Sequence, residues 1–520
     1  MAHKRGEKRQ RSGESTRDVV FERESAEVEH AVLTERFNVW SVIGMNFSLT
    51  ATPLGIGSYL VFTVGVGGSP FFIYGYILVV LLQLVVCLSL AEIAAKSFAN
   101  ELNPQGQIFW AGALASPQIS RMLSYWTGAF TTLSWTFATA GCFVLAGKIV
   151  AASATILSAT YEIQKYHVFL LAMASAGISL VFNTWLFKWV PKIAYFMAVF
   201  INLGTVYIFV SLLIRAHPKA TASSVFTEVI NNTGWSSDAL VFCLNILPGS
   251  LSVCAFDTAA HMAEEIPQPE RHVPKIMIYS ALLSGVSGLV MAIVYSFCTI
   301  DPSALLDPIG GQPIFQLFVD ALQSKPLVIV AAIIYCIVVV LGCIFFVTTL
   351  SRVVWSFSGH AGTPLGATLG FVHPRLGLPV HAVYAVTLAA SLLCLLEFGP
   401  DLILNACFGA GGICAAVSFG IPICCLLLGG RQQLSAIRPF SMGRFGAVVN
   451  FVAVIWQLFQ VVFLAFPVYY PVTARNMNWA LGVVIVGVIC SALNWLFFAR
   501  HFYETPKPLS LERIQDRQMP

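Results

Sequence analysis

TPLGIGSYLVFTVGVGGSP, residues 52–70, is the stretch of this chain that decides its fold. It lies inside a long apolar run, yet it holds five glycines and two prolines, the residue types that a helix interior tolerates least. In lipid, backbone groups released from a helix must find partners in protein or in an aqueous cavity. Pro53, Gly55 and Gly57 therefore predict a membrane helix that is broken near its middle. The alternative is a simple proline kink with glycines that allow close helix packing.

The second part of the same stretch has a different role. Gly65, Gly67 and Gly68 are followed by Pro70, and such a cluster is typical of a turn between two helices. We expect this turn to connect the first membrane span to the second.

The composition places the whole chain in a membrane. Hydrophobic residues make up 57% of the 520 residues and charged residues 10%, whereas a soluble protein carries about 25% charged residues. A membrane-spanning helix needs about 20 mostly apolar residues, and on that basis we expect about twelve spans. The prediction is an all-α integral membrane protein with about 12 transmembrane helices. The formal net charge of +4 arises from tails and loops and gives no indication of nucleic-acid binding.

The positions of the basic residues predict the orientation of the spans. Lysines and arginines are concentrated in the loops after the even-numbered spans, for example at Arg121, Arg271 and Arg438. Because cytoplasmic loops carry this excess, both termini are expected in the cytosol. We expect a multi-pass protein of the plasma membrane with a disordered cytosolic tail at residues 1–36 and a cytosolic tail at 500–520. Residues 37–499 form the predicted twelve-span membrane domain.

Two cytosolic loops, residues 96–121 and 351–379, are rich in aromatic residues, glycine and proline. They follow the second and the eighth span, and this spacing indicates a repeat in which spans one to five correspond to spans six to ten. An odd number of spans per copy makes the two copies inverted. The expected repeats cover residues 37–215 and 238–430, and residues 445–499 add two further helices.

The sixth span contains a second predicted break, because Pro248 and Gly249 interrupt it. Asp257 follows at a depth where a carboxylate is costly, and such a group is a functional candidate by default. In the alternative interpretation, the carboxylate accepts hydrogen bonds from N–H groups released by the break and contacts no substrate. The sequence favours neither interpretation.

Two broken helices at matching places in two halves of a chain point to the binding site of a transporter. Free N–H groups at the ends of half-helices suit a carboxylate, and free carbonyl groups suit an ammonium group. A zwitterionic amino acid matches both. Asn46, Trp126 and Thr348 are further candidates for the pathway, or they bond neighbouring helices to one another. We find no pattern that indicates an enzyme, a cofactor or a metal site.

Several motifs are similar to one family of permeases. SLAEIAAKSFANELNPQGQIFW at residues 89–110, FDTAAHMAEEIPQPERHVPKIM at 256–277 and SRVVWSFSGHAGTP at 351–364 resemble the amino acid-polyamine-organocation permeases. The second of these motifs is the most specific, and it resembles the fungal branch with GABA and choline permeases. The resemblance covers about residues 37–498.

The resemblance implies a five-plus-five inverted repeat in which the broken helices 1 and 6 hold the substrate, with two extra C-terminal helices. By the pattern of that family, one segment contacts the substrate carboxylate through its backbone and the other faces the amine or a bulky group. The first segment comprises Thr52, Pro53, Leu54, Gly55, Ile56 and Gly57, and the second comprises Val253, Cys254, Ala255, Phe256 and Asp257.

The function expected from this resemblance is secondary active import of an amino acid or a GABA-like amine by alternating access, with a proton as the coupling ion. The alternatives are a choline or polyamine permease and a nutrient sensor that does not transport. Two departures from the pattern leave the coupling ion and the gating details open. The glycines of the loop after the second span do not follow the family pattern. Some proton-driven relatives carry a lysine within the fifth span in place of a sodium ion, whereas Lys192 lies only at the start of that span.

Overall fold

The computed structural model describes residues 33, 36–95, 106–158, 160–399, 403–434, 438–473 and 476–506. Twelve of the helices in this part of the chain are long and apolar enough to cross a membrane. The prediction of an all-α protein with about twelve spans is confirmed. Most of the two predicted cytosolic tails, before residue 36 and beyond residue 506, lies outside the described residues.

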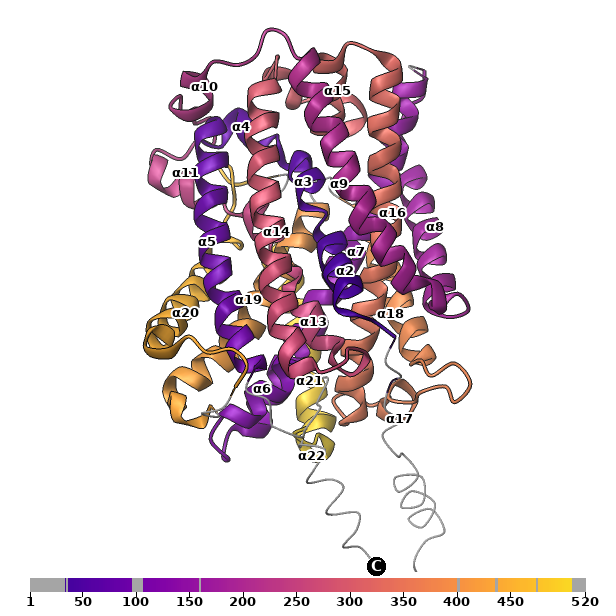
Figure 1. The fold of residues 1–520 in the computed structure, drawn as a ribbon, viewed down its shortest axis with the longest axis vertical. Coiled ribbons are helices and arrows are strands. Elements are labelled where there is room, and N and C mark those ends of the chain that lie inside the picture. Colours follow the sequence, from indigo (N-terminus) through magenta and orange to yellow (C-terminus); the bar gives the residue numbers. More distant parts are fainter. Residues whose placement is uncertain are drawn as a thin grey trace, which may run out of the picture.

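Spans one to five form the first half of the bundle (Figure 1). Its elements are α2 (Val39–Thr50), α3 (Thr52–Gly55), η1 (Ile56–Tyr59), α4 (Phe62–Gly65), α5 (Gly68–Ala94), α6 (Gln107–Leu114), α7 (Ser120–Leu157), α8 (Lys165–Asn183), η2 (Phe187–Trp189), α9 (Val190–Arg215) and α10 (Ala222–Phe226).

Spans six to twelve follow. Their elements are α11 (Asp238–Leu244), α12 (Leu247–Ser252), η3 (Ala255–Asp257), α13 (Thr258–His261), η4 (Ala263–Glu265), α14 (Pro269–Cys298), α15 (Pro313–Leu322), α16 (Lys325–Gly359), α17 (Gly366–Leu369), α18 (Val380–Leu393), η7 (Cys394–Phe398), α19 (Ile403–Gly429), α20 (Gly446–Phe463), α21 (Ala480–Asn494), η10 (Trp495–Ala499) and α22 (Arg500–Phe502).

Proline and glycine mark the ends of several spans. Pro191, Pro269 and Pro326 lie in the first turn of α9, α14 and α16, where a missing N–H costs nothing. Gly67 and Gly68 have φ angles of 92° and 74°, a left-handed conformation that glycine adopts without a steric penalty. They form the predicted turn from the first span into α5.

The two ends of the bundle carry different short helices (Figure 1). We call the lower end, with α6, α17 and α22, the α6 end, and the upper end, with α10 and α15, the α15 end. Helix α6 follows span two and α15 follows span seven, so these helices occupy equivalent places in the two halves and lie at opposite ends, as an inverted repeat requires. The prediction that paired the loop after span two with the loop after span eight was therefore wrong by one span.

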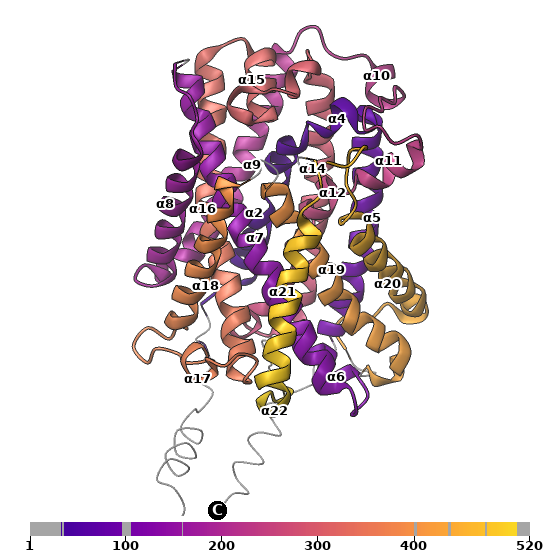
Figure 2. The same ribbon diagram turned by 180° about the vertical axis from the view of Figure 1, so that it is seen from behind.

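The broken spans run through the middle of the bundle. Helix α7 packs along α16 and α19, α14 packs along α5, and α2 packs against α9 and α14. Helices α20 and α21 pack on the outside, α20 against α19 and α5 and α21 against α19 (Figure 2). The last two spans are thus additions to a core of ten.

Candidate functional site

The first span is interrupted at Ala51, whose φ of 38° lies in the left-handed region. Helix α2 ends there, and the chain continues as the single turn α3 and the 3-10 turn η1. The break was predicted at Pro53, Gly55 and Gly57, so its existence is confirmed but its position is corrected. Pro53 lies in the first turn of α3, a place that suits a residue without an N–H.

The sixth span is interrupted more extensively. Helix α12 ends at Ser252, Val253 leaves the helical conformation with φ −133° and ψ 29°, and the 3-10 turn η3 and the short helix α13 follow. A break in this span was predicted and is confirmed, but its position is corrected: Pro248 and Gly249 lie within α12, and the helix is interrupted before them at Asn245 and after them at Val253.

The two breaks contact each other directly. The hydroxyl group of Thr52 donates a hydrogen bond of 2.8 Å to the backbone oxygen of Ser252. This bond joins the start of α3 to the end of α12. The start of the predicted segment in the first span therefore contacts the residue that precedes the predicted segment in the sixth span.

Two tyrosines hold the carbonyl groups of the first break. The hydroxyl of Tyr295 in α14 donates to the Pro53 oxygen at 3.0 Å, and the hydroxyl of Tyr335 in α16 donates to the Leu54 oxygen at 2.8 Å. The two hydroxyls lie 3.2 Å apart. No pattern in the sequence assigns these tyrosines to the break, because the contacts join distant parts of the chain.

The N–H groups of α3 are largely engaged as well. Pro53 has none, and those of Leu54 and Gly55 both donate to the Ala51 oxygen at 2.9 Å. In this conformation these three residues therefore offer no donor to a substrate carboxylate. Ile56 and Gly57 belong to the 3-10 turn that follows.

Asp257 is a junction between three parts of the bundle. Its Oδ2 atom accepts hydrogen bonds from Gln107 Nε2 at 2.9 Å and from Trp135 Nε1 at 3.3 Å, and it lies 3.2 Å from His261 Nε2. The side chain is buried, with 2% of the residue exposed. These partners are side chains of α6, α7 and α13. They are not the freed backbone N–H groups of the alternative interpretation.

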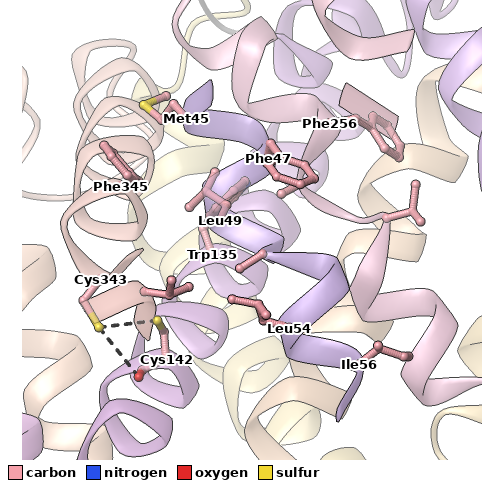
Figure 3. Close-up of a cluster of buried hydrophobic side chains, with 14 of the residues drawn as sticks. Met45, Phe47, Leu49, Leu54, Ile56, Trp135, Cys142, Phe256, Cys343 and Phe345 are labelled. Carbon is pink, nitrogen blue, oxygen red and sulfur yellow. Dashed lines mark hydrogen bonds between the residues drawn. The ribbon is translucent and has the colours of Figure 1, made fainter. Parts of the chain in front are cut away.

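Around Asp257, the second break is packed against aromatic and aliphatic side chains. The ring of Phe256 lies 5.3 Å from the ring of Phe419 in α19, and Val253 and Ala255 are buried. Cys254 is partly exposed, and its thiol donates to the Leu251 oxygen. Figure 3 shows Phe256 beside the segment formed by α2, α3 and η1, which carries Phe47, Leu54 and Ile56, with Trp135 close to the break.

Of the three further pathway candidates, one lies at the breaks. Asn46 in α2 donates to the Phe256 oxygen at 3.4 Å. Thr348 instead bonds α16 to α8, because its hydroxyl donates to Asn183 Oδ1 at 2.7 Å. Trp126 packs between Tyr125 and Phe130, in a cluster at the α6 end with η10. Thr348 and Trp126 are therefore not part of the site.

At the α6 end, the site is closed by charged residues. Arg352 Nε lies 2.9 Å from Glu265 Oε1, and both side chains are buried. The Arg352 guanidinium also lies 4.6 Å from the ring centre of Phe187. The backbone N–H groups of Arg36 and Phe37 donate to the Glu265 oxygen, so the start of the first span is held against the end of the sixth.

Glu264 belongs to the same closure. Its Oε2 atom accepts a hydrogen bond of 3.2 Å from the Leu33 N–H. Burial raises the pKa of Glu264 to about 7, and the neighbouring Glu265 carboxylate also raises it. This carboxyl group therefore changes its charge near neutral pH.

The α15 end is closed by packing. A Cβ atom added at Gly57 would lie 2.6 Å from Ile314 Cδ1 in α15 and 3.1 Å from the Tyr335 hydroxyl. A side chain at position 57 would therefore require the Ile314 side chain to move. With both ends closed, the breaks are occluded. Within the described residues there is also no group of three side chains suited to a metal ion.

Comparison with known proteins identifies relatives along most of the chain. A family model described as amino acid permease matches residues 37–490. A choline transporter of Saccharomyces cerevisiae is 27% identical over 89% of this chain and 82% of its own length. An amino-acid permease of Arabidopsis thaliana, BAT1, is 26% identical over 91% of this chain and 93% of its own length. Amino-acid permease 2 of Neurospora crassa is 25% identical over 91% of this chain and 87% of its own.

Proposed function

The chain belongs to the amino acid permease family, and from this premise we propose that it imports an amino acid or a GABA-like amine by alternating access, coupled to protons. It is a multi-pass membrane transporter and not an enzyme. The observation that carries the proposal is the contact between the two breaks. Thr52 of the first span bonds Ser252 of the sixth, between the two closed ends.

Alternating access follows from the way the two ends are closed. Opening the α6 end requires Arg352 to separate from Glu265 and the start of α2 to leave the end of span six. Opening the α15 end requires Ile314 to move away from Gly57. A transporter must not open both ends at once, and the occluded state described above is the intermediate between the two openings.

We assign the α6 end to the cytosol. Arg121 and Arg271 lie in the first turns of α7 and α14 and Arg438 lies in the connection before α20, all at this end, and an excess of basic residues is typical of the cytoplasmic side. Both termini are then cytosolic and uptake runs from the α15 end toward the α6 end. We propose the plasma membrane as the location.

The pair of Asp257 and His261 is the proposed site of the coupling proton. The two side chains lie one helical turn apart, 3.2 Å from each other, and both are buried. A buried carboxylate next to an imidazole can take up one proton without leaving a net negative charge in the membrane. Because Gln107 and Trp135 bind the same carboxylate oxygen, protonation would loosen α6 and α7 from span six.

A second candidate function is transport of choline, which the name of the yeast relative favours. Choline has no carboxylate, and it presents three methyl groups where an amino acid presents three N–H donors. Recognition of such a cation usually depends on an aromatic cage. Trp135, Phe256 and Phe419 lie near the breaks and are the aromatic residues that could contribute to one.

The test is an uptake assay in cells that lack their own carriers. Labelled GABA, neutral and basic amino acids, polyamines and choline are offered with and without a protonophore. We expect accumulation of at least one amino acid or GABA above the empty-vector level, and loss of that accumulation with the protonophore. Accumulation of none of these solutes despite surface expression would contradict the proposed function.

A further inference from the structure

A small polar cavity lies beside the breaks, between α2, the break of span six and α14. Its polar lining comes from the side chains of Asn46, Thr50, Ser280 and Ser284. It offers about 10 Å³ to the centre of a water molecule, which is room for about one water-sized group. The cavity is separate from the carboxylate of Asp257, which is not among its lining residues.

Asn46 has an oxygen without a partner in this cavity. The residue is 2% exposed, and its amide nitrogen donates to the Phe256 oxygen at 3.4 Å and to Ser280 Oγ at 3.3 Å. The Phe256 oxygen can only accept, so the nitrogen of the amide must face it. Asn46 Oδ1 then points elsewhere, and within the described part of the chain no donor reaches it. A buried acceptor of this kind is costly unless a water molecule or a ligand satisfies it.

Toward a molecule in the cavity, the hydroxyl groups of the lining can act mainly as acceptors, because their protons are donated elsewhere. Ser280 donates its proton to the Met277 oxygen at 3.1 Å, and Thr50 donates to the Phe47 oxygen at 3.3 Å. Thr50 Oγ1 lies 3.3 Å from Ser284 Oγ and 3.0 Å from Thr52 Oγ1, whose proton is donated to the Ser252 oxygen. Once the hydroxyl of a serine or threonine donates to a backbone carbonyl of its own helix, the lone pairs of its oxygen can still accept a hydrogen bond from a bound group. The cavity therefore suits a guest that only donates hydrogen bonds.

A primary ammonium group meets these conditions, because it has the size of a water molecule and three N–H donors. A trimethylammonium group has no N–H donor and is several times larger. We propose that this cavity binds the primary ammonium group of the transported solute, so that the protein carries primary amines in preference to their N-trimethylated forms. This inference rests on the proposed transport function and selects amino acids and GABA-like amines over choline.

The position of the cavity supports this assignment. Thr50 Oγ1 lies 3.0 Å from Thr52 Oγ1, and Thr52 donates to the Ser252 oxygen. The cavity therefore adjoins the hydrogen bond that joins the two breaks. Asn46 bonds the carbonyl group of Phe256, so the cavity also borders the break of the sixth span, next to Asp257 in the sequence. A small inorganic cation such as sodium shares this chemistry, and the test must separate the two.

The first experiment compares matched pairs of solutes that differ only in methylation of the nitrogen. GABA is paired with γ-butyrobetaine and ethanolamine with choline, each labelled and offered to cells that express the protein. We expect uptake of GABA or ethanolamine with at least tenfold preference over its trimethylated partner. Equal or better uptake of a trimethylated partner would overturn the inference while transport stands. Uptake of none of the four by surface-expressed protein would contradict both the inference and the transport of such amines.

The second experiment assigns the preference to the cavity. In Asn46→Leu we expect at least a tenfold loss of apparent affinity for the primary amine, and in the milder variant Ser284→Ala a smaller loss. Asn202→Leu is the matched control, because Asn202 is exposed on α9 and bonds only its own helix. All variants are compared at equal surface level. Unchanged affinity in both cavity variants would overturn the inference, and so would a wild-type requirement for sodium that Asn46→Leu abolishes without any change in affinity for the amine.

Discussion

Thr52 Oγ1 and the backbone oxygen of Ser252 lie 2.8 Å apart, and they join residues 200 positions apart in the sequence. The bond fixes the broken first span to the broken sixth span at their interruptions. Carbonyl groups released by a break usually need a partner in protein or water. Here the partner of the Ser252 carbonyl is a side chain of the other broken span.

We expect Thr52→Val to lower uptake at equal surface level. Valine keeps the shape of threonine but leaves the Ser252 carbonyl without a donor, at a cost of about 1–3 kcal/mol. Thr52→Ser keeps the hydroxyl and is the control. The measurement is the initial uptake rate at saturating solute. A valine variant as active as the wild type would show that the bond has no role in transport.

Asp257→Asn should impair transport more than Glu265→Gln. Asparagine keeps the size of the side chain at the junction of Gln107, Trp135 and His261, but it cannot take up the coupling proton. Uptake that remains in this variant should no longer respond to a protonophore. Glu265→Gln weakens a closure with Arg352 and leaves the junction intact. The reverse ranking would move the coupling site away from the break of span six.

The stability of the protein should depend on pH through Glu264. The pKa of this buried carboxyl is raised from 4.5 to about 7, so the folded state binds a proton that the unfolded state releases in this range. The stabilisation is fully present below pH 4.5 and is lost as the pH rises through about 7. We therefore expect the melting temperature in detergent to fall with rising pH across this window.

The matched variants for this pH effect are Glu264→Gln and Glu228→Gln. Glutamine at 264 removes the titration next to Leu33 and Glu265, and the fall in melting temperature should become smaller. Glu228 is exposed at the α15 end, so its variant should follow the wild type. Equal pH dependence in all three proteins would exclude Glu264 as the source.

Glu92 should be essential for stability at the α6 end. Its Oε1 atom lies 2.6 Å from Arg431 and 2.7 Å from Arg438 and accepts a bond from the Met442 N–H. Removing one member of a fully buried ion pair costs about 3–5 kcal/mol, and the cost here should be smaller because the side chains of Arg431 and Arg438 are 21% and 11% exposed. Glu92→Ala should therefore melt at a lower temperature than the wild type, and the exposed Glu162→Ala should not. Equal melting of the two variants would contradict this assignment.

The sequence predicted the spans well because the thickness of a bilayer sets the length of each apolar run. It also predicted two broken helices, since Pro53 and Pro248 stand in runs that should be continuous. The predicted position of the first break lies too far toward the C-terminus, because the residue that adopts the left-handed conformation is Ala51. Alanine rarely adopts a positive φ, so no local pattern indicates it.

The partners of the site were harder to predict than the breaks. Gln107 and Trp135 reach Asp257 from 150 and 122 positions away, and Tyr295 reaches the Pro53 carbonyl from 242 positions away. Such contacts depend on how the helices pack, which the pattern of apolar residues does not fix. For the same reason Thr348, which bonds α8, and Trp126, which packs in the aromatic cluster at the α6 end, lie outside the site.

The most direct test of the account is uptake of labelled GABA into proteoliposomes that contain the purified protein. We predict that a proton gradient directed inward accelerates uptake, that a protonophore abolishes the acceleration, and that the Asp257→Asn protein shows none. Uptake by the wild-type protein that is the same with and without the gradient would contradict proton coupling at Asp257. No uptake beyond that of protein-free liposomes would contradict the transport of GABA itself.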